Sequence, residues 1–389
     1  MKTIFHAALL LTFAALLVST ASAQQSNLGS IFTVVKTPNE NFDNNLQAAS
    51  ASSDTDIWAV GQETIHYNGT TWTAYPAPEI AGDNTSFLGG VVDISPTLAW
   101  AAGTINIGEA NPGQVIEQWN GTEWSEYPGP TFASGDQPAI FGMTSTSADD
   151  IWAVGDLLAD DGGAIFALFE HWDGTEWTAM TASAGTPFLM NASADAVDDA
   201  WAVGYNAEII DEDLTLAMHW NGTTWSQVST PNVGAGNNIL YGVAALASDN
   251  VWAVGYSTPV APPQSAATLT LIEHYNGTSW EVVSSPNVGP VNTYESNRLF
   301  GIVANTPSDI WAFGSYFAPT GSGHQQTLLL HYNGTKWTIQ PSPNPTKGDF
   351  LSDILWAGVV PSPGNIYIFG AEDEAPNEDS LAIHTTTGK

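Results

Sequence analysis

The sequence predicts an all-β protein folded as a seven-bladed β-propeller, with four antiparallel strands in each blade. A short apolar phrase ending in glycine, typified by D-I-W-A-V-G, recurs along the chain. Its central aromatic residues are Trp58, Trp100, Trp152, Trp201, Trp252, Trp311 and Tyr367. They stand 42 to 59 residues apart. A period of that length with β-rich text in each unit is typical of propeller blades.

Each unit contains four β-rich stretches, which we call strands a to d. An apolar run such as L-Y-G-V-A-A (240–245) predicts strand a, and the D-I-W-A-V-G phrase predicts strand b. A second repeated phrase, such as H-W-N-G-T-T-W (219–225), predicts strand c, a tight turn and the start of strand d. Asn-Gly between two β-rich runs favours a hairpin whose type I′ turn has positive φ at both central residues.

The seventh unit stops after strand c, at L-A-I-H-T-T-T-G-K (381–389). Its missing strand d is expected at the other end of the chain, because I-F-T-V-V-K-T-P-N (31–39) matches the strand d text W-E-V-V-S-S-P-N (280–287). We therefore expect residues 31–36 to pair with 381–386 and close the last blade. Closure would remove an open sheet edge. Residues 24–389 are predicted to form a single propeller domain.

Residues 1–23 are predicted to be a secretory signal peptide, with an apolar stretch at 7–18 and Ala21-Ser22-Ala23 as the cleavage site. We therefore expect a secreted, extracellular protein. The chain has no cysteine, 6 Lys plus Arg against 40 Asp plus Glu, and a net charge of −34. Such a charge disfavours nucleic acid as a partner. No stretch is long enough to predict a membrane span. We expect a monomer without a cofactor, although calcium stays open.

The D/N-G-T-x-W hairpin resembles the Asp-box of the sialidase-like propellers, which lies at the same turn between strands c and d. The match is partial, because a histidine and an aromatic residue precede a shorter turn here. The whole pattern also resembles kelch and galactose-oxidase propellers. Both resemblances imply the fold and not the activity. Sialidases use three arginines and this chain has only Arg298; galactose oxidases need a cysteine, and none is present.

A histidine recurs near the end of strand c, and an Asp or Asn opens strand b in the same units. Since the two strands are antiparallel, these side chains are expected to form one hydrogen bond within each blade. In unit two both members are replaced together, by Leu98 and Gln118. A shared metal site is disfavoured because the histidines are spread around a ring. The predicted His–Asp pairs are His66–Asp56, His171–Asp150, His219–Asp199 and His331–Asp309.

Two further repeated features have a structural and a functional interpretation. The Asn-Gly-Thr turns are also N-glycosylation sequons, and two other sequons lie outside them. Aromatic residues begin strand a, where they either pack in the core or form a stacking platform at the mouth of the central channel. The sequons are Asn68, Asn120, Asn221, Asn276 and Asn333, with Asn84 and Asn191; the aromatics are Phe87, Phe141, Phe188, Tyr241, Phe300 and Phe350.

A functional site is expected on the face that carries the long d–a and b–c connections, because these are not repeated. One candidate ligand site gathers around blade six, and one candidate calcium site is rich in carboxylates on blades three and four. The first comprises Tyr294, Glu295, Arg298, Tyr316, His324 and Asp349. The second comprises Asp160, Asp161, Asp211 and Asp213, beside Glu208 and Glu212. Chance loop composition and solvated acid are the alternatives.

The sequence favours a binding or interaction module that recognises glycans or another extracellular partner. No nucleophile or metal-protease motif is present, so an enzyme is the less favoured interpretation. The alternatives are a polysaccharide hydrolase or lyase that uses carboxylates such as Glu295 and Asp349, and a structural component of a cell surface. A pair of carboxyl groups about 5–10 Å apart in a cleft would favour hydrolysis.

Overall fold

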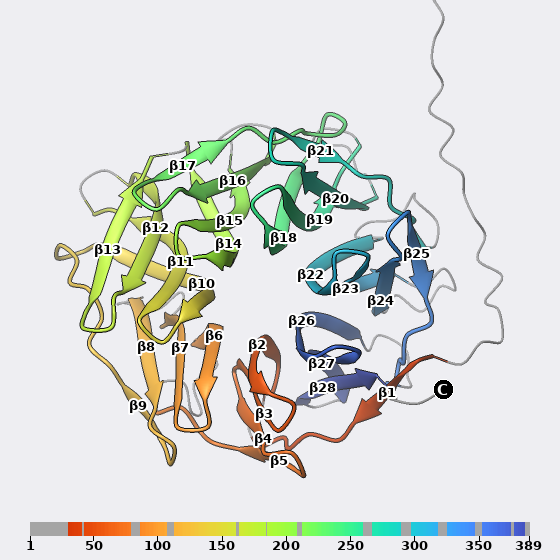
Figure 1. Ribbon diagram of the computed structural model, residues 1–389, viewed down its shortest axis with the longest axis horizontal. Helices are drawn as coiled ribbons and strands as arrows, with labels where there is room; N and C mark the ends of the chain where they lie inside the picture. The colour runs from red at the N-terminus through yellow and green to blue at the C-terminus, as the bar shows by residue number, and fades with distance from the viewer. Residues whose placement is uncertain are drawn as a thin grey trace, which may run out of the picture.

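The computed structural model describes residues 30–40, 43–78, 86–106, 113–160, 163–183, 185–207, 212–259, 267–288, 297–317, 325–346, 352–374 and 377–385. The predicted signal peptide lies outside these ranges. The described residues form seven four-stranded antiparallel sheets arranged around a ring (Figure 1). In this part of the chain no helix is long and apolar enough to cross a membrane.

Each blade runs from an inner strand a to an outer strand d (Figure 1). The first three blades consist of β2 (Leu46–Ser53), β3 (Asp56–Gly61), β4 (Thr64–Tyr67) and β5 (Trp72–Ala74); β6 (Phe87–Ser95), β7 (Leu98–Ile105), β8 (Gly113–Trp119) and β9 (Trp124–Glu126); and β10 (Gln137–Ser147), β11 (Asp150–Leu158), β12 (Ile165–Trp172) and β13 (Trp177–Ala182).

The next three blades follow the same order. They consist of β14 (Pro187–Ala196), β15 (Asp199–Asn206), β16 (Leu214–Trp220) and β17 (Trp225–Val228); β18 (Asn238–Ala247), β19 (Asn250–Ser257), β20 (Leu269–Tyr275) and β21 (Trp280–Val282); and β22 (Asn297–Thr306), β23 (Asp309–Phe317), β24 (Gln325–Tyr332) and β25 (Trp337–Gln340).

Blade seven is completed by the N-terminal strand, as the sequence predicts. It consists of β26 (Asp353–Ser362), β27 (Asn365–Glu374), β28 (Asn377–Thr385) and β1 (Phe32–Val35), in that order from the channel outward. Strand β1 pairs antiparallel with β28 from Phe32↔Thr385 to Val35↔Ala382. The first and last described strands therefore lie side by side in one sheet (Figure 1).

The core lies between neighbouring blades. Trp58 of strand b in blade one is fully buried and packs edge-on against Trp119 and Trp124 of blade two, with ring centroids 4.8 and 4.9 Å apart. Trp152 of blade three contacts Trp225 of blade four edge-on and Trp220 at a tilt. Large aromatic rings in such edge-to-face pairs stabilise the interface beyond the apolar area that they bury. The repeated tryptophans thus join the blades.

A β-bulge at the same level of strand a occurs in all seven blades. One residue is skipped in the pairing of strands a and b. The skipped residues are Gln47, Gly89, Phe141, Met190, Tyr241, Phe300 and Trp356. Phe87 and Phe188 stand two positions before the skipped residue of their strands, so the aromatic residues of the predicted platform do not all lie at one level of strand a. Phe350 lies outside the described residues. A bulge bends the strand and redirects its side chain.

The turns between strands c and d differ from the expected type I′ geometry. Positive φ occurs at the glycines, for example +86° at Gly69, but not at the preceding asparagines. Instead the Asn68 side-chain oxygen accepts hydrogen bonds from the backbone N–H groups of Thr70 and Thr71, both at 3.0 Å. Asp173 makes the same bonds in blade three. Since an Asp side chain accepts the same hydrogen bonds as an Asn side chain, the geometry of the turn accounts for an Asn or Asp at this position.

Candidate functional site

The candidate site begins at the residue that follows the W-A-V-G glycine of strand b. This position lies at the end of strand b nearest the long connections, and in blade two it reaches toward blade three. There the Thr104 hydroxyl donates to the Ile140 carbonyl and accepts from the Ile140 amide, at 3.3 and 3.1 Å. Blades three, four and five carry Asp156, Tyr205 and Tyr256 at this position. The residue at this position is not part of the repeat, since it also differs in the other blades.

Partly exposed aromatic rings spread from this position across blades four to six. Tyr205 stacks on Phe188 of its own blade, with centroids 5.2 Å apart and planes 17° apart. Tyr256 stacks on Tyr241 at 6.0 Å, and Tyr241 meets Phe300 of blade six edge-on at 5.3 Å. We call these five residues the aromatic arc. All but Tyr256 are half-buried, so part of each of the other four residues is exposed to solvent.

Arg298 lies on the arc. The carbon atom of its guanidinium stands 4.6 Å from the centroid of the Tyr256 ring. A guanidinium over an aromatic face within about 6 Å is attracted by the ring, and more strongly when water is partly excluded. Tyr256 is only 8% exposed, and Arg298 is half-buried. The stacking fixes the cation at the blade-six end of the arc.

Carboxyl groups mark the other end of the arc. Asp156 of β11 is 7% exposed, and burial raises its pKa to about 7. Burial also raises the pKa of Asp213 in blade four. Burial first, and then the charges of Asp213 and Asp156, raise the pKa of the Tyr205 phenol. Below pH 7 Asp156 is therefore mostly a neutral carboxylic acid that can donate a hydrogen bond.

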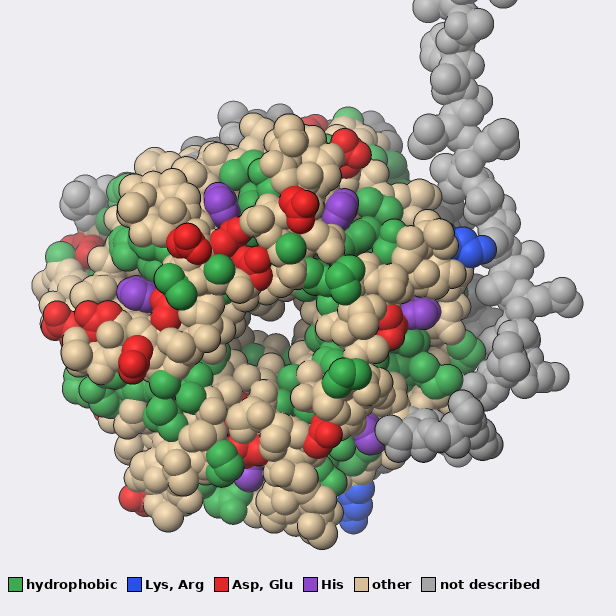
Figure 2. All heavy atoms as spheres, viewed as in Figure 1, with side chains coloured by type: hydrophobic (Ala, Val, Ile, Leu, Met, Phe, Trp, Pro, Cys, Tyr) green, Lys and Arg blue, Asp and Glu red, His purple; other side chains and the backbone are tan. Residues whose placement is uncertain are grey.

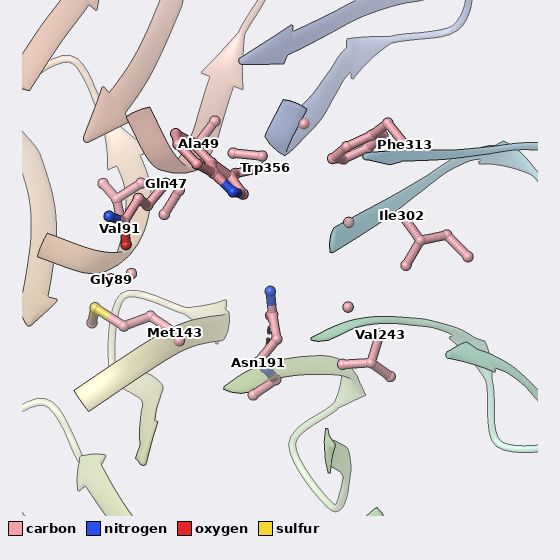
Figure 3. A pocket seen from close by; sticks show the side chains of 18 residues that line it. Gln47, Ala49, Gly89, Val91, Met143, Asn191, Val243, Ile302, Phe313 and Trp356 are labelled. Atoms are coloured by element: carbon pink, nitrogen blue, oxygen red, sulfur yellow. Dashed lines mark hydrogen bonds between the residues drawn. The ribbon is translucent and has the colours of Figure 1, made fainter. Parts of the chain in front are cut away.

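The central cavity adjoins the arc but is small. Its volume is about 170 Å³, and its wall is built from small residues of strand a, including Gly142, Gly242 and Gly301 (Figure 3). A β-carbon on Gly142 would lie 2.7 Å from the Asn191 α-carbon of the next blade. Ligand pockets usually measure about 300–1,000 Å³. A ligand larger than a few atoms would therefore not fit inside the cavity.

Asn191 belongs to the wall of this cavity, where its side chain points inward (Figure 3). It lies in β14, the innermost strand of its blade, and its side-chain oxygen accepts from the Ala192 amide at 2.7 Å. Glycosylation of Asn191 stays a prediction, and Asn84 lies outside the described residues.

Only Arg298 and Tyr316 of the predicted blade-six group lie within the described residues; Tyr294, Glu295, His324 and Asp349 lie outside them. Tyr316 packs into the hydrophobic cluster between blades five and six, and its hydroxyl donates to the Gln326 side-chain oxygen at 2.6 Å. Arg298 and Tyr316 stand in adjacent strands but have different partners. The shared site that they were predicted to form stays a prediction.

The predicted calcium site is only partly described, because Asp161 and Asp211 lie outside the described residues. Asp160 is exposed, and its amide donates to the Asp136 carboxylate at 3.1 Å. Asp213 instead lies near Tyr205 of blade four. Within the described ranges no group of three or more His, Asp or Glu side chains could hold a metal ion. Calcium binding therefore stays a prediction.

The repeated histidines lie at the opposite ends of strands b and c, on the face with the tight turns. Each donates to or accepts from the residue that opens strand b of its own blade. The distances are 2.6 Å (His66–Asp56), 2.7 Å (His171–Asp150), 2.9 Å (His219–Asp199), 2.8 Å (His274–Asn250), 2.7 Å (His331–Asp309) and 2.5 Å (His384–Asn365). Figure 2 shows these histidines spaced around the opening of the channel. They are separate contacts and not one site.

The comparisons with known proteins place the chain in a class by fold. No protein-family model matches the sequence, and no curated protein matches it. Similar solved structures include an ulvan lyase of polysaccharide lyase family PL25, bound to -[GlcA(1-4)Rha3S]-, with 11% identity and a TM-score of 0.56 over 90% of this chain and 95% of that one. Such a likeness shows the propeller fold alone.

Two other similar solved structures belong to longer chains, of which the match covers only a part. An ancestral GH74 enzyme has 12% identity and a TM-score of 0.51, covering 90% of this chain and 47% of that chain. The endosialidase of phage phi92 has 10% identity and a TM-score of 0.50, covering 92% of this chain and 70% of that chain. The protein is thus a seven-bladed β-propeller, and its activity has to be argued from its own residues.

Proposed function

We propose that this protein is a secreted carbohydrate-binding propeller whose ligand rests on the aromatic arc. The observation that carries the proposal is the arc itself: Phe188, Tyr205, Tyr241 and Phe300 are half-buried rings on three neighbouring blades. Sugar rings have apolar faces that stack on such aromatics and hydroxyls that need polar partners. Arg298 and Asp156 supply polar partners at the two ends. Carbohydrate-acting enzymes among the similar folds agree with this proposal.

Oligosaccharide binding by variants of the arc tests the proposal. A glycan array identifies a binder, and titration calorimetry then compares the wild type with Tyr241→Ala and Tyr205→Phe. We expect Tyr241→Ala to weaken binding up to about tenfold, because a stacked ring contributes about 0.5–1.5 kcal/mol. The control is Val197→Ala, whose side chain is 65% exposed on the opposite face. Equal affinity of all variants, or no bound saccharide at all, would contradict the proposal.

A polysaccharide-acting enzyme is the second candidate, and Asp156 is the observation that favours it. A buried carboxyl with a pKa of about 7 has the protonation behaviour of a general acid at neutral pH. It lies beside a tyrosine, at the end of the arc opposite to Arg298. An enzyme would release shortened or unsaturated sugars from the polysaccharides that it binds. Asp156→Asn would then abolish product release; binding without any product in the wild type excludes this candidate.

A further inference from the structure

The wall of the central cavity has one polar exception. In each strand a, the residue after the bulge stands at the same level of the channel, and in six blades it is glycine or alanine. Neighbouring blades approach closely there, since a β-carbon on Gly242 would lie 2.9 Å from the Gly301 α-carbon. Blade four has Asn191 instead, and its side chain points into the cavity (Figure 3). The other residues at this level are Ala48, Gly90, Gly142, Gly242, Gly301 and Ala357.

Two N–H groups converge on this cavity from opposite sides of the ring. The Asn191 side-chain oxygen accepts from the Ala192 amide, so its nitrogen presents donors to the cavity. Trp356 is the bulge residue of blade seven, where it is half-buried and lines the same cavity. Figure 3 shows the nitrogen of each side chain directed to the middle of the cavity. Within the residues that the structure describes, neither nitrogen has a hydrogen-bond partner of its own.

The chemistry of this cavity suits a small, uncharged group that accepts hydrogen bonds. Both nitrogens are donors, and one carbonyl oxygen can accept from two donors at once. Among the described residues that line the cavity there is no Lys, Arg or His, so an ionised carboxylate would lose its hydration there without gaining a counter-charge. Met143, Val243 and Ile302 add apolar wall (Figure 3). An acetyl group has a carbonyl oxygen, an apolar methyl and few enough atoms to enter.

We propose that the saccharide on the aromatic arc carries an acetyl group, which enters the central cavity and accepts hydrogen bonds from Asn191 and Trp356. This inference rests on the proposed function and adds the substituent of the ligand to it. Tyr241 of the arc directly precedes Gly242 of the cavity wall, and it occupies the same bulge level as Trp356. A sugar ring stacked on Tyr241 therefore has the cavity beside it, within reach of one substituent. N-linked and O-linked acetyl groups share this chemistry.

The experiment uses pairs of ligands that differ only in the acetyl group. Titration calorimetry compares chitotetraose with cellotetraose, which carry an acetamido and a hydroxyl group on the same backbone. It also compares an acetylated xylo-oligosaccharide with the same material after alkaline deacetylation. The first pair tests an N-linked acetyl group and the second tests an O-linked one.

Three variants test the cavity itself. Asn191→Gly introduces the glycine that four other blades have at this level, and Trp356→Phe keeps an aromatic ring without the N–H group. Gln47→Ala is the matched control, because the Gln47 head group also lines the cavity but lies beside Gly89, away from Asn191 (Figure 3). Melting temperatures show whether the variants fold.

We expect the wild type to prefer at least one acetylated form over its partner by about tenfold, the combined effect of two hydrogen bonds between neutral groups. Asn191→Gly and Trp356→Phe should each reduce this preference to about threefold, and the double variant should remove it while still binding the unacetylated form. Gln47→Ala should keep it. Equal binding within both pairs, a preference that the double variant retains, or an equal loss in Gln47→Ala would overturn this inference while the proposed function stands. Absence of binding to every saccharide tested would overturn both.

Discussion

At the scale of single residues, the His–Asp pairs show how one repeated contact can fix three strands. The Asp309 carboxylate bonds His331 of strand c with one oxygen and the Asn305 side chain of strand a with the other, both at 2.7 Å. His331 also stacks on Trp311, with centroids 4.3 Å apart. Ser52 and Thr146 contact Asp56 and Asp150 in the same way. Each such carboxylate has both its oxygens satisfied inside its own blade.

Removing this carboxylate should therefore destabilise the blade. We expect Asp150→Ala to lower the free energy of unfolding by about 1–3 kcal/mol, because the partly buried His171 and Thr146 side chains lose their hydrogen bonds to this carboxylate. Urea unfolding measures the change. The control is Gln118→Ala in blade two, where Leu98 replaces the aspartate; it should change stability by less than about 0.5 kcal/mol. Equal effects of the two substitutions would show that the His–Asp bond contributes nothing of its own.

At the scale of the strand, one short motif explains why the N-terminal segment fits blade seven. Strand d is followed by Thr-Pro-Asn or Ser-Pro-Asn in several blades, and the asparagine oxygen accepts from an amide in the first half of strand c. Asn232 accepts from Thr215 at 3.0 Å, and Asn287 accepts from Thr270 at 2.8 Å. Asn39 does the same for Ser380 at 2.9 Å. The N-terminal segment thus repeats both the pairing and the fastening of strand d.

Ring closure should depend on the buried side chain of this strand. Phe32 is 2% exposed and packs edge-on against Trp311 at 5.1 Å, whereas its neighbour Ile31 is 50% exposed. We expect Phe32→Ala to reduce stability by about 3–5 kcal/mol, as for other large-to-small core substitutions. Ile31→Ala should change it by less than about 0.5 kcal/mol. Thermal unfolding compares the two; similar melting temperatures would mean that β1 does not hold the ring closed.

The strand level is also where prediction from sequence loses accuracy. The W-A-V-G-like and Asn/Asp-Gly-Thr phrases locate strands b, c and d, because the first recurs in all seven blades and the second in the first six. Strand a varies more, and its bulge changes which residues share a level, so Phe87 was aligned with Phe141 although Gly89 occupies that level. The Leu-x-Gly spacing in strand a contains this signal. Tyr205 and Tyr256 are not singled out by the repeat, because strand b extends beyond its repeated glycine to include them.

At the scale of the whole molecule, the two faces of the ring differ in how far sequence determines them. The tight-turn face is made of repeated residues, and its turns and His–Asp contacts follow from the repeat. The opposite face depends on which unrepeated side chains the ring brings together. Sequence identified Arg298 as unusual, but its contact with Tyr256 joins residues of different blades. Such contacts need the curvature of the ring, which no local pattern contains.

Buried carboxyl groups on several blades make the stability of the whole fold depend on pH. Glu170 and Glu273 of strand c are fully buried, and burial raises the pKa of each to about 8. Burial raises the pKa of Asp93 to about 8 and of Glu63 to about 7. The folded state therefore holds protons that the unfolded chain releases near pH 4.5. The stability that these protons confer is complete below about pH 4.5 and is lost as pH rises toward 8.

We expect the free energy of unfolding to fall by a few kcal/mol between about pH 5 and pH 8, because ionising a carboxyl group away from water is costly. Replacing both glutamates, in Glu170→Gln with Glu273→Gln, removes two of these groups while keeping their shape. This variant should match the wild type near pH 5, exceed its stability at pH 8 and show a shallower decline between them. Urea unfolding at each pH measures the slope, with the exposed Glu126→Gln as control. A wild-type stability that stays level from pH 5 to pH 8, or a double variant with an unchanged slope, would show that these carboxyl groups are ionised in the folded ring.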